Sequence, residues 1–162
     1  MNAFIRFILL AALALGGTAL RAADAKYGLA ADNKIRAQAL VAEIMAANPE
    51  LLTAGMHCVP PGRQTQAIIA STLNVIGKPS DPPDVDVGAH GETILSPNLK
   101  IPKLGIMLPL HDSTGKGIGA LALAFKYPAG ADQVACFAKA VAIRDQVAKK
   151  IPALGELFEV AP

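Results

Sequence analysis

The segment Leu104–Tyr127 constrains the fold of this chain more than any other, because it has the pattern of two strands joined by a tight turn. The turn, at 112–115, has Asp in its first position and Gly in its fourth, as type I turns prefer. Apolar residues occupy both faces of both strands, whereas a half-solvated antiparallel sheet alternates apolar with polar residues. We therefore expect other parts of the chain to cover each face of this hairpin.

The register of the hairpin depends on its turn. A two-residue loop at 113–114 would place the leucines of the first strand beside the leucines and Phe125 of the second. A type I turn followed by a bulge at Gly115 would instead place them beside a row of alanines, namely Ala120, Ala122 and Ala124. Because a glycine directly follows the turn, we predict the bulged form, with the leucines beside the alanines.

Residues 1–25 have the pattern of a secretory signal peptide. Arg6 supplies a positive charge, residues 7–15 form an apolar run too short to span a bilayer, and residues 23–25 fit the A-x-A cleavage pattern. Cleavage nearer Ala22 and an uncleaved membrane anchor are the alternatives. No later segment is apolar over enough residues to cross a membrane. We therefore expect a periplasmic or secreted protein with no stable membrane insertion after cleavage.

Residues 26–162 have the length of one domain with a single core. Loss of residues 1–25 lowers the formal charge from +2 to about +1. A chain this close to neutral, with no basic run and no Trp, gives no electrostatic reason to bind nucleic acid. We accordingly expect no nucleic-acid partner.

The segments on either side of the hairpin predict helices and short strands. Apolar residues at helical spacing predict one long helix from Asp32 to about Asn48, capped by Asp32 or Asn33, and another from Ala131 to Lys150. Between them we predict, in order, a helical turn at 49–52, strands at 56–59 and 67–72, a short helix started by the prolines of 78–84, and a strand at 93–95. This order predicts the α+β class, with an antiparallel sheet, a long N-terminal helix and a C-terminal helix.

The arrangement resembles the PAS-like extracytoplasmic sensor domains of the Cache superfamily, in their small single-Cache form. The likeness rests on the long first helix, on the segments 67–71 and 76–81, and on 108–112 followed by Gly115 and 118–121. In Cache domains a PAS-like sheet and a loop-and-helix flap enclose a pocket, commonly for organic acids, amino acids or amines. The resemblance therefore implies a small organic ligand for residues 26–162. Secreted profilin-like proteins that bind haem or metabolites have a similar layout and are the neighbouring alternative.

Four residues are candidate ligand contacts. His90 lies in a Gly-flanked segment where a flap over a pocket would be. Met107 and His111 point to the same side of the first hairpin strand, and Arg63 could bind a carboxylate through both arms of its guanidinium. Two of them also have a purely structural interpretation, since His111 could be a strand residue with a satisfied imidazole and Arg63 a solvated turn residue.

Cys58 is placed on a strand and Cys136 on the closing helix, and two cysteines in an exported chain suggest a disulfide between them. Two free thiols that pack as small hydrophobic residues are the alternative. The three histidines have no metal-ligand spacing, so we expect no metal and no cofactor. His57 is interpreted as a strand residue with a satisfied imidazole, and Asp84 as an acid stabilised by a helix start.

The sequence contains no nucleophile elbow, no pair of carboxylates on one face and no phosphate-binding glycine loop, so we do not expect an enzyme. We expect an exported, soluble sensor-type domain that binds a small molecule and has no output domain of its own. Such a domain would present its ligand to a membrane receptor or transporter. The basis is that alanine and glycine make up part of one hairpin face, which leaves room for a ligand. A structural or protein-interaction module of the periplasm, with no pocket, is the alternative.

Overall fold

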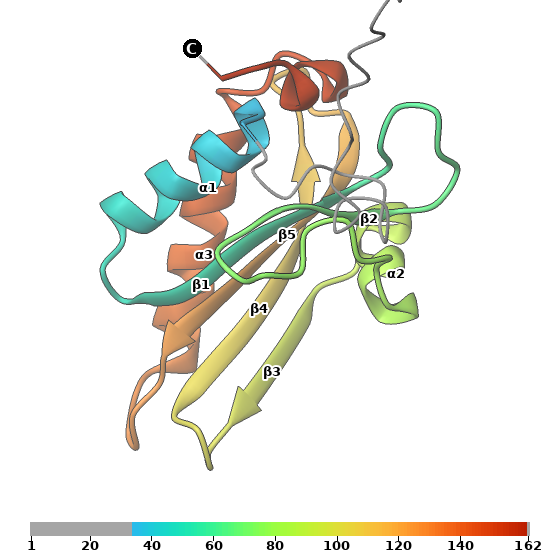
Figure 1. Ribbon diagram of the computed structural model, residues 1–162. Coiled ribbons are helices and arrows are strands. Elements are labelled where there is room, and N and C mark those ends of the chain that lie inside the picture. The colour runs from blue at the N-terminus through green and yellow to red at the C-terminus, as the bar shows by residue number, and fades with distance from the viewer. Residues whose placement is uncertain (1–33, 162) are drawn as a thin grey trace, which may run out of the picture.

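A computed structural model of the chain describes residues 34–161 (Figure 1). In chain order, its elements are α1 (Arg36–Ala47), β1 (Leu51–Cys58), β2 (Ala67–Ser71), α2 (Pro82–His90), β3 (Ile94–Asn98), β4 (Lys103–His111), β5 (Gly117–Lys126), α3 (Gln133–Ala148) and the short 3-10 helix η2 (Leu154–Phe158). The predicted signal peptide and the predicted helix caps Asp32 and Asn33 lie outside the described residues. Within 34–161, no helix is both long and apolar enough to cross a membrane.

The five strands form one antiparallel sheet in the order β2–β1–β5–β4–β3. The two strands of the predicted hairpin are β4 and β5, and β5 lies in the middle of the sheet with β1 on its other side. An antiparallel sheet with separate helices confirms the α+β class. The hairpin is thus the centre of the sheet.

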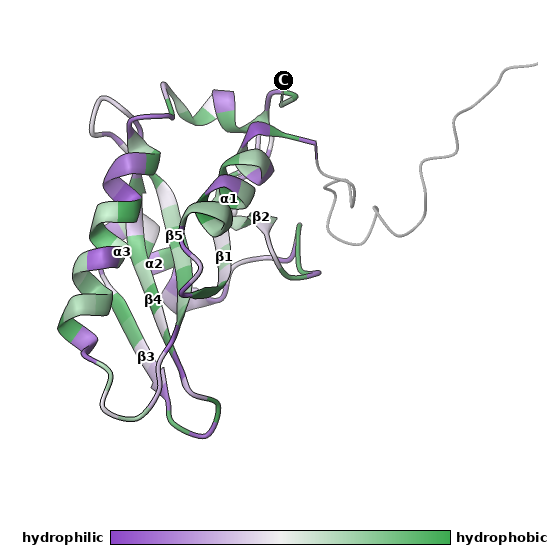
Figure 2. Cartoon of the chain, turned by 90° about the vertical axis from the view of Figure 1, so that its left-hand side faces the viewer, coloured by the Kyte–Doolittle hydropathy of each residue, from purple (hydrophilic) through white to green (hydrophobic). Residues whose placement is uncertain are grey.

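The two long helices cover the same face of the sheet. α1 packs against β1 and β2, and α3 packs against β4 and β5. Both views show the two helices on one side (Figures 1 and 2). The core between them and the sheet includes the fully or almost fully buried side chains of Leu104, Leu108, Leu121, Leu123 and Phe125. Each such side chain contributes roughly 1.5–3 kcal/mol by leaving water.

The short helix α2 packs against β5, β4 and β1 and supplies a residue to the cavity on the other face of the sheet. Its start agrees with the sequence: Asp81 is the N-cap residue, Pro82 and Pro83 follow, and Asp84 lies in the first turn. Gly91 ends the helix in the left-handed conformation, with φ of +75°. Since both long helices lie on the opposite side, α2 and the cavity beside it occupy this face of the hairpin.

The predicted hairpin register is wrong, although the turn has the expected form. Asp112 accepts hydrogen bonds from the backbone N–H and hydroxyl of Thr114 and from the backbone N–H of Lys116, while Gly115 has φ of +87°. A second irregularity follows at once, because His111 lies opposite Gly117 whereas Leu110 lies opposite Gly119. This one-residue shift cancels the shift made at Gly115. Leu104, Ile106 and Leu108 therefore lie opposite Phe125, Leu123 and Leu121, not opposite the alanines.

The predicted helical turn at 49–52 is also wrong, because β1 already begins at Leu51. Asn48 ends α1, where its side chain donates a hydrogen bond to the carbonyl of Ile44 at 2.7 Å. Leu51 then lies opposite Phe125 of β5 and is buried. Pairing with the central strand outweighs the local helical preference of this segment.

Cys58 and Cys136 are free thiols, so the disulfide prediction is wrong and the alternative holds. Burial raises the pKa of the Cys136 thiol, and so do the nearby carboxylates of Asp132 and Glu50. Glu50 directly precedes β1, whereas Cys58 is the last residue of that strand. An extended strand of this length spans about 26 Å at ~3.3 Å per residue, and bridged Cα atoms lie within about 7 Å of each other. The two thiols thus lie toward opposite ends of β1.

Candidate functional site

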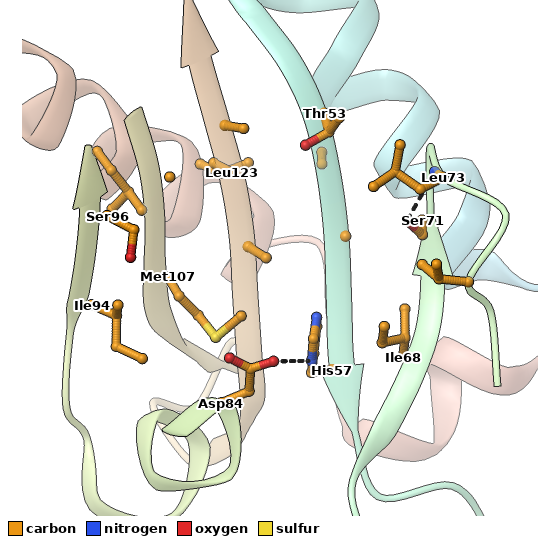
Figure 3. Close-up of a pocket in the computed structure, with 17 residues that line it drawn as sticks. Thr53, His57, Ile68, Ser71, Leu73, Asp84, Ile94, Ser96, Met107 and Leu123 are labelled. Atoms are coloured by element: carbon orange, nitrogen blue, oxygen red, sulfur yellow. Dashed lines mark hydrogen bonds and ion pairs between the residues drawn. The ribbon is translucent and has the colours of Figure 1, made fainter. Parts of the chain in front are cut away.

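A cavity of about 260 Å³ lies on the face of the sheet opposite α1 and α3 (Figure 3). Its floor is formed by β1, β5 and β4, and β2, β3 and the first turn of α2 surround it. The residues that line it include Thr53, Gly55, His57, Ile68, Ser71, Leu73, Asp84, Ile94, Ser96, Gly105, Met107, Ala122 and Ala124. Most of this surface is apolar, and a few hydroxyls, one imidazole and one carboxylate interrupt it.

Small residues at the centre of the floor create this space. Gly55 lies opposite Ala122 across β1 and β5, and Gly105 lies opposite Ala124 across β4 and β5. Side chains of a strand stand roughly perpendicular to the sheet. At these four positions no side chain above the sheet is larger than a methyl group. The prediction that the face made of alanine and glycine leaves room is confirmed.

A polar cluster lies at the α2 end of the cavity. His57 points from β1 into this face, and its Nδ1 is 3.0 Å from the hydroxyl oxygen of Ser80. The same Nδ1 is 3.6 Å from a carboxylate oxygen of Asp84, which extends from the first turn of α2 toward His57 (Figure 3). The imidazole is almost fully buried, while a quarter of the Asp84 side chain is exposed. Within residues 34–161, Nε2 of His57 makes no hydrogen bond.

Burial lowers the pKa of His57 below its ordinary value of 6.5, and the carboxylates of Asp84 and Asp81 oppose that shift only in part. The imidazole is therefore neutral at pH 7. A carboxylate and a hydroxyl beside Nδ1 favour the tautomer that carries its proton there. Nε2 is then left with a free lone pair, so His57 serves the cavity as a hydrogen-bond acceptor.

This cluster does not have the geometry of a catalytic triad. In a Ser–His–Asp triad the serine and the carboxylate bind different nitrogens of the imidazole: the carboxylate orients the ring through Nδ1–H, and Nε2 takes the proton of the serine. Here Ser80 and Asp84 both approach Nδ1. In the described part of the chain, no three His, Cys, Asp or Glu side chains are grouped so that they could hold a metal ion. The cluster thus places an imidazole, a hydroxyl and a carboxylate at one end of the cavity without the arrangement of a triad.

Acidification should destabilise the protein through His57. Because its pKa is lower in the folded chain than in the unfolded one, the unfolded chain binds the proton more readily between the two values. The contribution to stability is complete above about pH 6.5 and is lost as the pH falls through the folded pKa. The matched variant is His57→Asn, whose amide can still contact Ser80.

Urea unfolding from about pH 7.5 to about pH 5.5 tests this expectation. The free energy of unfolding should fall more steeply with acidification in the wild type than in the variant. His90 and His111 are present in both proteins, so the comparison isolates the effect of His57. Parallel curves for the two proteins would contradict the prediction.

Of the four residues predicted to contact a ligand, only Met107 lines this cavity. His90 lies on the outer side of α2, where it is two-thirds exposed and its Nδ1 is 3.5 Å from a carboxylate oxygen of Asp86. His111 lies at the far end of β4, beside the turn, and lines a shallow hollow with Asp145. Arg63 lies exposed in the loop between β1 and β2. The structure does not bring these three residues together with Met107.

Sequence reasoning missed His57 and Asp84 as site residues. Their roles depend on contacts between β1 and α2, which local patterns do not reveal. One signal was present: Gly55 and His57 alternate with the apolar Ala54 and Met56, which places the histidine on the same face as the glycine. That alternation could have identified His57 once the small-residue face was recognised as the side of the cavity.

A wider hollow of about 730 Å³ lies at another part of the surface, between α2, the loop before β2 and the start of β5. Its lining residues include Val59, Gln66, Gly88, Ile118 and Leu154, and Ser80 also borders it. None of its lining residues within 34–161 carries an ionisable side chain. The smaller cavity is therefore the candidate site, because it combines an apolar surface with the His57 and Asp84 cluster.

No protein family and no curated protein sequence matches this chain. Solved structures with similar folds include the type II free methionine-R-sulfoxide reductase of Thermoplasma acidophilum, with 15% identity and a TM-score of 0.49 over 76% of this chain and 92% of that one. The GAF domain of the Acinetobacter phosphoenolpyruvate-protein phosphotransferase has 16% identity and a TM-score of 0.49 over 69% and 77% of the two chains. The inducer-binding domain of the Acinetobacter transcription factor PobR, a double mutant in complex with 3-hydroxybenzoic acid, has 11% identity and a TM-score of 0.46 over 73% and 96%.

Proposed function

We propose that this chain is a small-molecule-binding domain of the sensor type, whose ligand occupies the cavity above Ala122 and Ala124. The observation that carries the proposal is the cavity itself. It is built from paired small residues at the centre of the sheet, and it has one cluster of polar groups at one end. Ligand sites in proteins are mostly apolar hollows in which a few placed polar groups fix the orientation of the ligand.

The size and polarity of the cavity narrow the ligand. Its volume of about 260 Å³ lies just below the usual range of ligand pockets, roughly 300–1,000 Å³, so a small metabolite fits it better than a large cofactor. Ile94 and Met107 offer apolar contact area, while the hydroxyl of Thr53 and the imidazole of His57 offer polar contacts. The ligand in this proposal has an apolar body and one polar end.

Export and a separate partner are the remaining parts of the proposal. They rest on the signal-peptide pattern of residues 1–25 and on the resemblance to extracytoplasmic sensor domains. In this scheme the bound state is read by a membrane receptor or transporter. The alternative, an interaction module without a ligand, would use the same sheet only as a scaffold.

Native mass spectrometry of the protein isolated from the cell envelope tests export and ligand binding in one measurement. Loss of about 25 N-terminal residues from the intact mass supports export. An additional mass that leaves on denaturation supports a bound molecule, whose identity follows from that mass. The matched variant Ala122→Leu fills the floor of the cavity and should carry none of the additional mass, whereas Ala46→Leu, on the exposed face of α1, should keep it.

A wild-type protein without bound mass, whose melting temperature no small molecule raises, would contradict ligand binding. Equal occupancy of the wild type and Ala122→Leu would place the ligand outside this cavity. An uncleaved N-terminus would overturn export alone.

A further inference from the structure

In the part of the chain that the structure describes, one side chain with a formal charge at neutral pH lines the cavity. It is that of Asp84, since burial keeps His57 neutral. No Lys or Arg of the described chain is among the lining residues. A bound anion would therefore face a carboxylate with no cation to offset it.

The carboxylate of Asp84 also lacks a cationic partner of its own. Asp81, the N-cap residue, lies 3.9 Å from the ammonium of Lys78, and Asp86 lies 3.5 Å from Nδ1 of His90, which is a cation only when it is protonated. Within residues 34–161, Asp84 has only the neutral imidazole of His57, at 3.6 Å. A protonated group in the cavity would give this carboxylate its missing partner.

The N-terminus of α2 does not make up for the missing Lys or Arg, because it offers no binding site for an anion. Helix N-termini bind anions through free backbone N–H groups, but Pro82 and Pro83 have none. The next two N–H groups, those of Asp84 and Val85, both donate to the carbonyl of Asp81, at 3.0 and 3.2 Å. The first turn thus offers no free donor toward the cavity.

A second acceptor at this end is Nε2 of His57. With its proton on Nδ1, the neutral ring presents a lone pair at Nε2, and nothing in the described chain donates to it. The Asp84 carboxylate and Nε2 of His57 are thus both acceptors at this end of the cavity. A ligand that binds these two groups must bring hydrogen-bond donors.

We propose that the cavity selects a small organic amine in its protonated form, with its ammonium group beside Asp84 and Nε2 of His57. Its apolar body lies over Ala122 against Met107 and Ile94. The inference rests on the proposed function and sharpens it, because it excludes the organic acids that the sensor-domain resemblance equally implied. Charge-assisted hydrogen bonds to a partly buried carboxylate supply both affinity and orientation.

Probes of matched shape test the proposal. Benzylamine, benzyl alcohol and benzoate share one ring and differ in their polar group, and isobutylamine, isobutanol and isobutyrate repeat the comparison with a smaller body. Dissociation constants from NMR titration of the full protein are expected to be at least tenfold lower for each amine than for its acid. The alcohol, which donates but carries no charge, should lie between them.

Two variants of α2 distinguish the effect of the Asp84 charge from the effect of the shape of its side chain. Asp84→Asn keeps the shape of the side chain and removes its charge, so it should weaken amine binding at least tenfold while changing alcohol binding less than threefold. Asp86→Asn, two residues further along α2 and already paired with His90, should leave both unchanged. The ranking of the probes on the wild type tests the same inference should Asp84→Asn fail to fold.

The outcomes distinguish the two proposals. Acids that bind as tightly as amines, or amine binding that survives Asp84→Asn, would overturn the amine inference while leaving a ligand-binding cavity in place. Binding of any probe that Ala122→Leu does not reduce would place it elsewhere and overturn both. Failure of all six probes to bind would also count against both.

Discussion

Gly119→Ala is expected to destabilise this protein by roughly 3–5 kcal/mol, which is a large part of the stability of a typical domain. A side chain at this position would collide with the carbonyl oxygen of His57 and lie 2.8 Å from Sγ of Cys58. The backbone itself is unfavourable for any other residue, because φ is +151°. Steric overlap and backbone strain therefore add together.

Gly119→Ala should also disturb the candidate site. Gly119 lies opposite Cys58 at the end of β1, and Gln66 holds the neighbouring carbonyl of His57 through a hydrogen bond of 3.1 Å. Gly88 of α2 also approaches this point so closely that a side chain there would come within 3.2 Å of Gly119. Moving the two strands apart would displace both His57 and the helix that carries Asp84.

Gly117→Ala is the matched control for this prediction. It lies two residues earlier on the same strand, has no positive φ, and a side chain there would meet nothing within 4 Å. We expect this variant to be unchanged or up to about 1 kcal/mol more stable. Thermal and urea unfolding give the two values. Equal effects at both positions, or a loss below about 1 kcal/mol for Gly119→Ala, would show that the second bulge does not hold the strands in this register.

The same bulge explains why the hairpin was predicted only in part. The type I turn at Asp112 and the bulge at Gly115 follow from residue preferences within a few positions. The shift between Gly117 and Gly119 depends on what lies on each face: it brings the leucines of β4 to the side that α1 and α3 cover. The sequence shows which residues alternate but does not show which side the helices take. A one-residue change of register is therefore decided by tertiary packing.

The candidate site was predictable to a similar degree. Alanine and glycine on one face of the hairpin predicted the space, since small side chains leave volume wherever no other element enters it. The polar cluster was not predictable, because His57, Ser80 and Asp84 come from a strand, a loop and a helix start that meet only in the folded chain. His90 and His111 drew attention through their local sequence, yet they lie apart from the cavity.

Neighbouring residues of β5 should respond oppositely to substitution, because they face opposite sides of the sheet. Leu121 is fully buried against the helices, so Leu121→Ala should cost about 2–5 kcal/mol through lost burial and the void that remains. Ala122 faces the cavity, where a leucine finds empty volume, so Ala122→Leu should leave stability unchanged or raise it by up to about 2 kcal/mol. Chemical unfolding of both variants measures the contrast. A severe loss for Ala122→Leu would mean that this face is already filled, which would remove the space that the proposed ligand needs.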